Sequence, residues 1–261
     1  MSLSAFAKDY AARTFGQAAN ALDETDPEFA DFWKNFAFDE VVNAGAYQDV
    51  APLDDQTRFV AILAATLGCQ ALDAFKFVAC AALNVGLEPV AFKEIVYQAT
   101  AYLGLARTLP FIVAANDLLR ERGVELPLPP QGKTTRENRI GVGNQIQIEF
   151  FGEGMRETWK KAQPGRANIN LWLAGNCFGD YYSRDGLDAR RREMITFCFL
   201  AAQGGCEPQL VGHAIGNMRV GNSKEFLFQV VEQCVPYVGY PRSLNALAAI
   251  DKAVAQMQSQ G

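Results

Sequence analysis

The sequence contains a single histidine, His213, among 261 residues. One histidine excludes the multi-histidine sites that hold zinc, and the six cysteines lack the paired spacing of a zinc-binding cluster. We therefore expect these cysteines to be mostly buried, reduced thiols, and we expect neither a metal nor a cofactor.

The sequence also has no apolar run that reaches the roughly 18 residues of a membrane span; its longest, 59–69, is shorter. The N-terminal segment has scattered charges and lacks the apolar core of a signal peptide. A net charge of −5 argues against nucleic acid and anionic membranes as partners. We expect a cytoplasmic protein that acts on a small-molecule substrate.

Alternating β-branched runs are scarce, so the predicted fold class is all-α. Residues 123–132, with three prolines, predict a linker. We expect an N-terminal unit over 1–125, a linker over 126–139 and a C-terminal unit over 140–261. Residues 43–52 are predicted to form a loop. The expected helical segments are 1–28 (ending in an acidic turn), 29–38, 57–67, 72–85, 89–102, 109–122, 140–151, 168–182, 189–203, 208–221, 223–237 and 243–258.

Residues 187–221 predict a helical hairpin. Asp188 suits an N-cap, and the pair Gly204-Gly205 ends the first helix because glycine adopts the left-handed conformation at little cost. Pro208 suits the first position of a second helix. In the same way, Asn222 is expected to cap the helix that follows the hairpin.

The hairpin carries three residues whose chemistry suits catalysis, Glu193, Cys206 and His213. Cys206 begins the second helix, and His213 lies two turns further along on roughly the same face. We expect the three side chains to line one pocket, with Glu193 within hydrogen-bond or one-water reach of His213. The structural alternatives are a solvated charge run, a buried thiol and a core histidine.

An internal repeat becomes visible when the chain is shifted by 135 residues. Three of the pairs that it aligns are Gly86 with Gly221, Gln98 with Gln233 and Tyr102 with Tyr237. His213 falls on Val78, Glu193 meets Gln56 or Phe59, and Cys206 aligns with Cys69 only after a two-residue gap. We expect residues of about 53–122 to superpose on about 187–258, with the polar site in the second copy.

The second copy resembles the carboxymuconolactone decarboxylase family, which includes the alkylhydroperoxidase D-like proteins. The residues that carry the resemblance are the segments FGDY at 178–181 and RDGLD at 184–188, the pair Arg192-Glu193, His213, and YVGYPR at 237–242. The resemblance implies an alkylhydroperoxidase D-like helical bundle, duplicated within the chain. It also implies a homo-oligomer: a trimer, which is common for double-copy chains, with a hexamer as the alternative.

The family's peroxidase branch uses two cysteines, and here Gln209 stands where the second cysteine would be. A lone Cys206 needs another thiol to resolve it. The decarboxylase branch needs no thiol: His213 or Glu193 would supply the proton, and Arg184, Arg192 and Arg242 would hold carboxylates.

Asn217, one turn beyond His213, would orient the imidazole or contact the substrate. Three hypotheses follow: a lyase that decarboxylates a small carboxylated lactone or related ring compound, a thiol-dependent peroxidase, and a non-catalytic ring-forming or small-molecule-binding protein.

Overall fold

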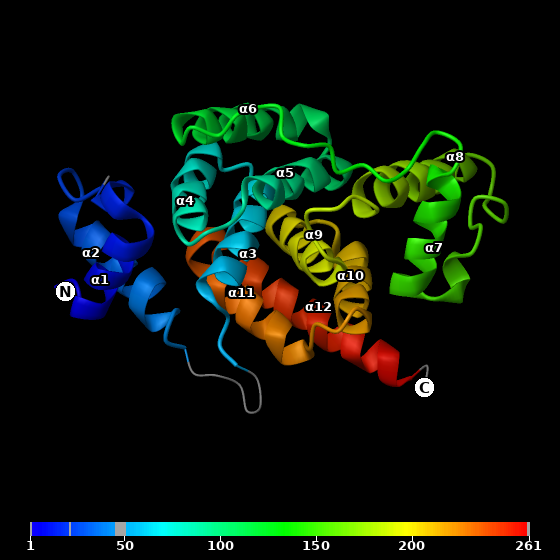
Figure 1. Cartoon of the computed structure of the whole chain (residues 1–261). Coiled ribbons are helices and arrows are strands. Elements are labelled where there is room, and N and C mark those ends of the chain that lie inside the picture. Colours follow the sequence, from blue (N-terminus) through cyan, green and yellow to red (C-terminus); the bar gives the residue numbers. More distant parts are fainter. Residues whose placement is uncertain (1, 21, 45–50, 260–261) are drawn as a thin grey trace.

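The computed structural model describes residues 2–20, 22–44 and 51–259, and these residues contain helices and no β-strand (Figure 1). The all-α prediction is confirmed. Most of the loop expected over 43–52 lies outside the described residues. The α-helices are α1 (Ala5–Thr14), α2 (Pro27–Asn35), α3 (Asp55–Gly68), α4 (Leu72–Asn84), α5 (Pro89–Leu103), α6 (Leu105–Glu121), α7 (Arg139–Phe151), α8 (Ala167–Trp172), α9 (Ala189–Gln203), α10 (Glu207–Arg219), α11 (Lys224–Val238) and α12 (Tyr240–Gln258).

The helix order repeats within the chain. Helices α4, α5 and α6 begin 135 residues before α10, α11 and α12, at 72 and 207, 89 and 224, and 105 and 240. The elements in front of them also correspond, because α1, α2 and the π-helix η2 (Phe36–Glu40) occur in the same order as α7, α8 and the π-helix η4 (Leu173–Tyr182). The helix order therefore follows the predicted register and extends beyond it to α1. Superposition of the two halves, and the limits of the two units, remain predictions.

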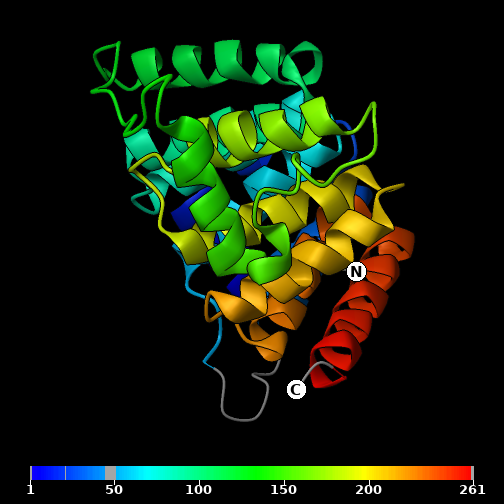
Figure 2. The ribbon, with the colours of Figure 1, turned by 90° about the vertical axis from the view of Figure 1, so that its right-hand side faces the viewer.

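The two sets of helices pack reciprocally around α3 and α9, which lie against each other at the centre of the molecule (Figures 1 and 2). Helix α5 packs on α9, and its counterpart α11 packs on α3. A side chain at Gly68 would meet the Phe199 carbonyl oxygen at 2.6 Å, so a glycine is needed where α3 approaches α9. Each half thus covers the central helix of the other.

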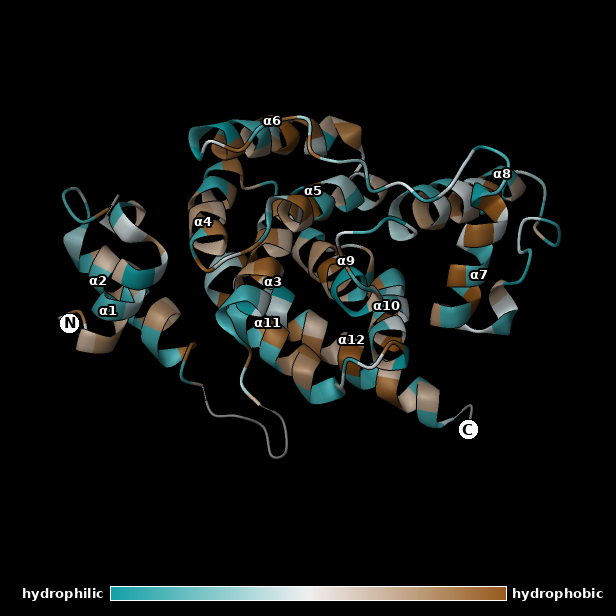
Figure 3. Cartoon of the chain, in the orientation of Figure 1, coloured by the Kyte–Doolittle hydropathy of each residue, from teal (hydrophilic) through white to brown (hydrophobic). Residues whose placement is uncertain are grey.

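The core is continuous through this centre. From Arg58 onward α3 is buried throughout, and its apolar side chains join those of α1, α4, α5 and α9 in one cluster. Figure 3 shows hydrophobic residues along the central helices and a largely hydrophilic loop between α7 and α8. Among the described residues, no helix is long and apolar enough to cross a membrane. The cytoplasmic location remains a prediction.

Several local expectations can be compared with the structure. The hairpin is confirmed: Asp188 accepts a hydrogen bond from the Arg191 backbone N–H, and Gly204 ends α9 with φ of 68°. The cap of α11 is Ser223 and not Asn222, whose amide instead binds Arg190 and Asn217. The first helix is also shorter than expected: α1 ends at Thr14.

Candidate functional site

Glu193 and His213 form a buried pair between α9 and α10. The Nδ1 atom of His213 lies 2.9 Å from Oε2 of Glu193, as the sequence predicted. Glu193 is fully buried, and 11% of the His213 side chain is exposed. A carboxylate at Nδ1 favours the tautomer with the proton on that nitrogen, which leaves Nε2 to accept or donate a proton.

Two tyrosines extend this pair into a chain of hydrogen bonds. The Tyr182 hydroxyl donates to Oε1 of Glu193 at 2.9 Å and lies 2.9 Å from the Tyr102 hydroxyl. Tyr102 in turn lies 3.4 Å from Nε2 of His213. Burial raises the pKa of both tyrosines well above the usual value. Both hydroxyls therefore stay protonated, so they can relay a proton but do not become bases at neutral pH.

The backbone around the pair is arranged to admit the carboxylate. A side chain at Gly216 on α10 would come within 2.3 Å of Oε2 of Glu193 and 2.8 Å of Cε1 of Phe151. Asn217 is fully buried and donates to the carbonyl oxygens of Glu193 and His213. Asn217 thus braces α9 against α10, and it does not line the cavity that His213 faces, where a substrate contact would be expected to lie.

His213 and Cys206 line one cavity of about 560 Å³. Glu193 lies behind His213 and does not line it, which corrects the expectation of three side chains in one pocket. Residues from α5, α7, α9, α10 and the π-helix η4 form the walls, which are mainly apolar and aromatic. The other lining residues are Ala101, Tyr102, Phe151, Met155, Leu173, Cys177, Phe178, Leu200, Gln203, Gln209, Gly212, Ile215 and Arg219.

Two thiols face this cavity. Cys206 is half-buried; its thiol donates to the Leu200 carbonyl oxygen at 3.4 Å and accepts from Nε2 of Gln203 at 3.6 Å. Cys177 comes from η4 and donates to the Tyr102 hydroxyl at 3.7 Å. Burial raises the pKa of the Cys177 thiol to about 12. Cys177 is therefore a protonated, poorly nucleophilic thiol near neutral pH.

The three arginines expected to hold carboxylates lie outside this cavity. Arg192 is fully buried and binds Glu94, Gln98 and two backbone carbonyls. Arg184 pairs with Glu94 at 2.9 Å, and Arg242 donates to the Ala202 carbonyl oxygen. The arginine that does line the cavity is Arg219, at the end of α10. The described residues include no group of three or more His, Cys, Asp or Glu side chains that could hold a metal ion.

The model of the carboxymuconolactone decarboxylase family matches residues 170–252. Those residues include η4, Glu193 and His213. Residues 170–252 belong to the carboxymuconolactone decarboxylase family.

Among solved structures, the chain is similar to a protein from Burkholderia xenovorans LB400 that is proposed to be a gamma-carboxymuconolactone decarboxylase subunit. The TM-score is 0.56 at 19% sequence identity, over 98% of this chain and 97% of that one. This similarity shows that the fold is shared over the whole chain. Comparison with curated proteins gave no match.

The family segment alone does not contain the whole site. Tyr102 and Phe151 lie outside residues 170–252, and they reach the cavity from α5 in the first half of the chain and from α7. Tyr102 had one sequence signal, its alignment with Tyr237 in the repeat. Cys177, Tyr182 and Arg219 had none beyond their place in the family segment, because no pattern on one helix shows which residues of another helix lie opposite.

Proposed function

We propose that this chain is an acid–base enzyme that decarboxylates a small carboxylated ring compound such as an unsaturated lactone. The observation that carries the proposal is the Glu193–His213 pair, with its buried carboxylate on Nδ1 and its imidazole edge on a cavity of about 560 Å³. A cavity of this size and apolar lining suits a compact ring.

The proposed reaction breaks the bond between the ring and its carboxylate. The electron pair of that bond moves into the unsaturated ring to form a dienolate, and carbon dioxide leaves. His213, with a proton on both ring nitrogens, then delivers the Nε2 proton to carbon, and the neutral imidazole that remains regains a proton from water. Apolar walls such as Phe151 and Leu200 weaken the hydration of the carboxylate, which favours its loss.

Glu193 acts through His213 and is a positioning residue. It holds the Nδ1 proton, which keeps Nε2 turned toward the cavity and stabilises the charged imidazolium. Tyr182 fixes the second carboxylate oxygen. Arg219 is the cavity's cationic side chain among the described residues, and it would attract an anionic substrate.

A second candidate is a thiol-dependent peroxidase, because Cys206 and Cys177 face the same cavity. The Cys206 thiolate would take the terminal oxygen of a hydroperoxide and release an alcohol. Cys177 would then displace water from the sulfenic acid to form a disulfide, which an external dithiol would reduce. The raised pKa of Cys177, due to burial, makes this resolving step slow, so we favour the lyase.

Three substitutions separate these candidates. His213→Ala should lower carbon dioxide release from 4-carboxymuconolactone by about 10²–10⁴-fold, while Cys206→Ser should leave it near the wild-type rate. Hydroperoxide consumption with dithiothreitol should be low in the wild type and should rise in Gln209→Cys, which restores an adjacent resolving thiol.

A folded Cys206→Ser protein that is inactive in both assays would overturn the preference for the lyase. A wild-type protein that is inactive in both assays would instead support a non-catalytic binding role.

We also propose that the chain forms a homo-oligomer and that this homo-oligomer is a trimer. Corresponding positions of the two halves expose apolar side chains: Leu105 and Leu109 on α6, and Tyr240 and Leu244 on α12, are each more than half exposed. Such faces favour burial against another copy. Light scattering at micromolar concentration should give a multiple of the 28.6 kDa chain mass; a monomer mass would contradict this proposal.

A further inference from the structure

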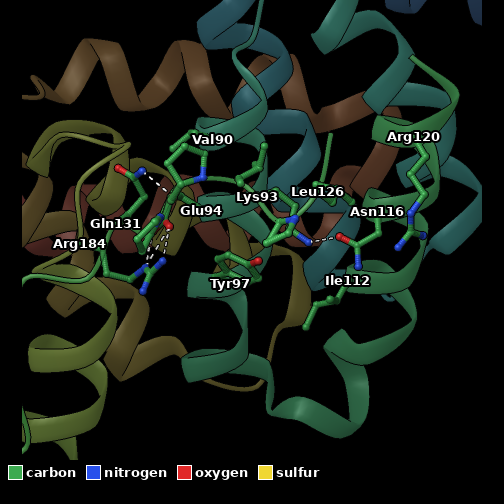
Figure 4. Close-up of a pocket in the computed structure, with 14 residues that line it drawn as sticks. Val90, Lys93, Glu94, Tyr97, Ile112, Asn116, Arg120, Leu126, Gln131 and Arg184 are labelled. Carbon is green, nitrogen blue, oxygen red and sulfur yellow. Dashed lines mark hydrogen bonds and ion pairs between the residues drawn. The ribbon is translucent and has the colours of Figure 1, made fainter. Parts of the chain in front are cut away.

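A second cavity, of about 540 Å³, lies in the first half of the chain (Figure 4). Helices α5 and α6 form two of its walls, the proline-rich linker over 126–131 forms another, and Arg184 closes one side. It shares no lining residue with the His213 cavity. The linker that was expected to separate two units thus covers this cavity. Its side chains Leu126 and Leu128 are half-buried against the core.

Lys93 places a buried cation in this cavity. Only 4% of the residue is exposed, and its Nζ atom donates to Oδ1 of Asn116 at 2.5 Å (Figure 4). Nζ also lies 4.8 Å from the centre of the Tyr97 ring. Among the described residues, no carboxylate forms an ion pair with Lys93. A buried ammonium whose hydrogen-bond acceptor is a neutral amide lacks the counter-charge that such groups normally have.

The neighbouring charges do not supply that counter-charge. Glu94 is the nearby carboxylate in the cavity wall, and both Arg184 and Arg192 bind it, at 2.9 Å and 3.1 Å. Arg120 pairs with Asp117 at the exposed rim. Burial, followed by the proximity of Arg120, lowers the pKa of Lys93. The cavity wall therefore carries an excess of positive charge.

Apart from Gln131, whose amide donates to the Pro129 carbonyl oxygen, the rest of the wall is apolar. Val90, Ile112, Leu126 and Leu128 line it together with Pro127, Pro129 and Pro130, which have no backbone N–H to offer an anion. A site for inorganic phosphate would be expected to present several N–H donors. Arg120 and Arg184 also line the cavity, but they are already paired with Asp117 and Glu94, so the cation without a carboxylate partner is the Lys93 ammonium. An ammonium beside apolar side chains matches a carboxylate that is attached to an apolar body.

We propose that this cavity is a second ligand site, which binds a small organic carboxylate through the Lys93 ammonium and the Asn116 amide. The apolar part of the ligand lies against Ile112 and the linker. The Tyr97 ring lies beneath the cationic groups, since the Arg184 guanidinium is 5.6 Å from its centre. The bound carboxylate provides the counter-charge that the protein itself does not place at Lys93.

The test is a titration of the full-length protein with 4-fluorobenzoate, with 4-fluorobenzamide as the neutral probe of the same shape. We expect 4-fluorobenzoate to bind and to raise the melting temperature. In Lys93→Met, which keeps the length of the side chain without its charge, affinity should fall about tenfold or more. Lys76→Met, on the exposed surface of α4, is the matched control and should bind as the wild type does.

Several outcomes would overturn the proposal: equal binding of the benzamide, equal or tighter binding of inorganic phosphate, or unchanged binding by Lys93→Met. Loss of binding in Arg219→Met with retention in Lys93→Met would also overturn it, by moving the ligand to the His213 cavity. Should Lys93→Met not fold, Ile112→Trp fills the cavity while keeping the ammonium. Unchanged affinity in Ile112→Trp would likewise contradict the site.

Discussion

The two halves of the chain share one set of helices and differ in which polar groups these helices bury. Counted from the N-cap aspartates Asp54 and Asp188, Arg58 corresponds to Arg192. Both arginines are buried, and each binds a glutamine of the other half: Arg58 donates to Gln233 at 2.8 Å and Arg192 to Gln98 at 2.7 Å. This reciprocal pair joins the halves, so the role of Arg192 is structural.

The next position separates the two halves. Glu193 corresponds to Phe59, which is 1% exposed and packs edge-on against Phe15 with ring centres 5.4 Å apart. His213 corresponds to Val78, which is also buried. The comparison teaches that the buried arginine–glutamine link is common to both halves, whereas the Glu193–His213 pair and its tyrosine hydrogen bonds occur in the second half.

The largest expected effect comes from placing the carboxylate in the wrong half. Phe59→Glu should lower the free energy of unfolding by about 4 kcal/mol or more, because the carboxylate would be buried among aromatic rings and the neighbouring Tyr10 hydroxyl already donates to Asp55. The reciprocal Glu193→Leu should cost less, about 2 kcal/mol, while abolishing activity. Urea unfolding measures both, with Phe59→Leu as the size control. A smaller loss for Phe59→Glu than for Glu193→Leu would show that the two environments do not differ as described.

An intermediate effect is expected at Gly216, whose counterpart in the first half is Ala81, where no carboxylate has to fit. Gly216→Ala should push Glu193 away from His213, lowering activity about tenfold and the free energy of unfolding by about 1–3 kcal/mol. Gly141→Ala on α7 has open space around it and should stabilise by up to about 1 kcal/mol. Full activity in Gly216→Ala would mean that the carboxylate does not need its present position.

The smallest effect concerns another corresponding pair, Arg107 and Arg242. Arg242 is half-buried and binds the Ala202 carbonyl, whereas Arg107 is exposed and binds the Gln203 side chain at 3.0 Å. Arg242→Ala should cost about 1.5 kcal/mol and Arg107→Ala about 0.5 kcal/mol or less, with activity unchanged in both. Loss of activity in Arg242→Ala at near-normal stability would indicate instead that Arg242 contacts the substrate.

The sequence by itself determined the all-α fold, the glycine-ended hairpin over 187–221 and the 135-residue register. These are local or periodic properties: helix spacing, capping residues and turn glycines act within a few positions of one another. The contact between Glu193 and His213 followed for the same reason, because one tight turn joins their helices.

Only the tertiary structure decided which side chains surround that pair. Tyr102 reaches His213 from 111 positions away, and Arg192 turns from the expected clamp into a buried link to Gln98 and Glu94. The direction of a long side chain depends on which helix packs against its own, and that packing depends on the close approach of α3 and α9 at Gly68. No pattern within a single helix records this packing. The sequence therefore indicated Arg184, Arg192 and Arg242 as residues of the cavity, whereas in the structure Arg219 lines it.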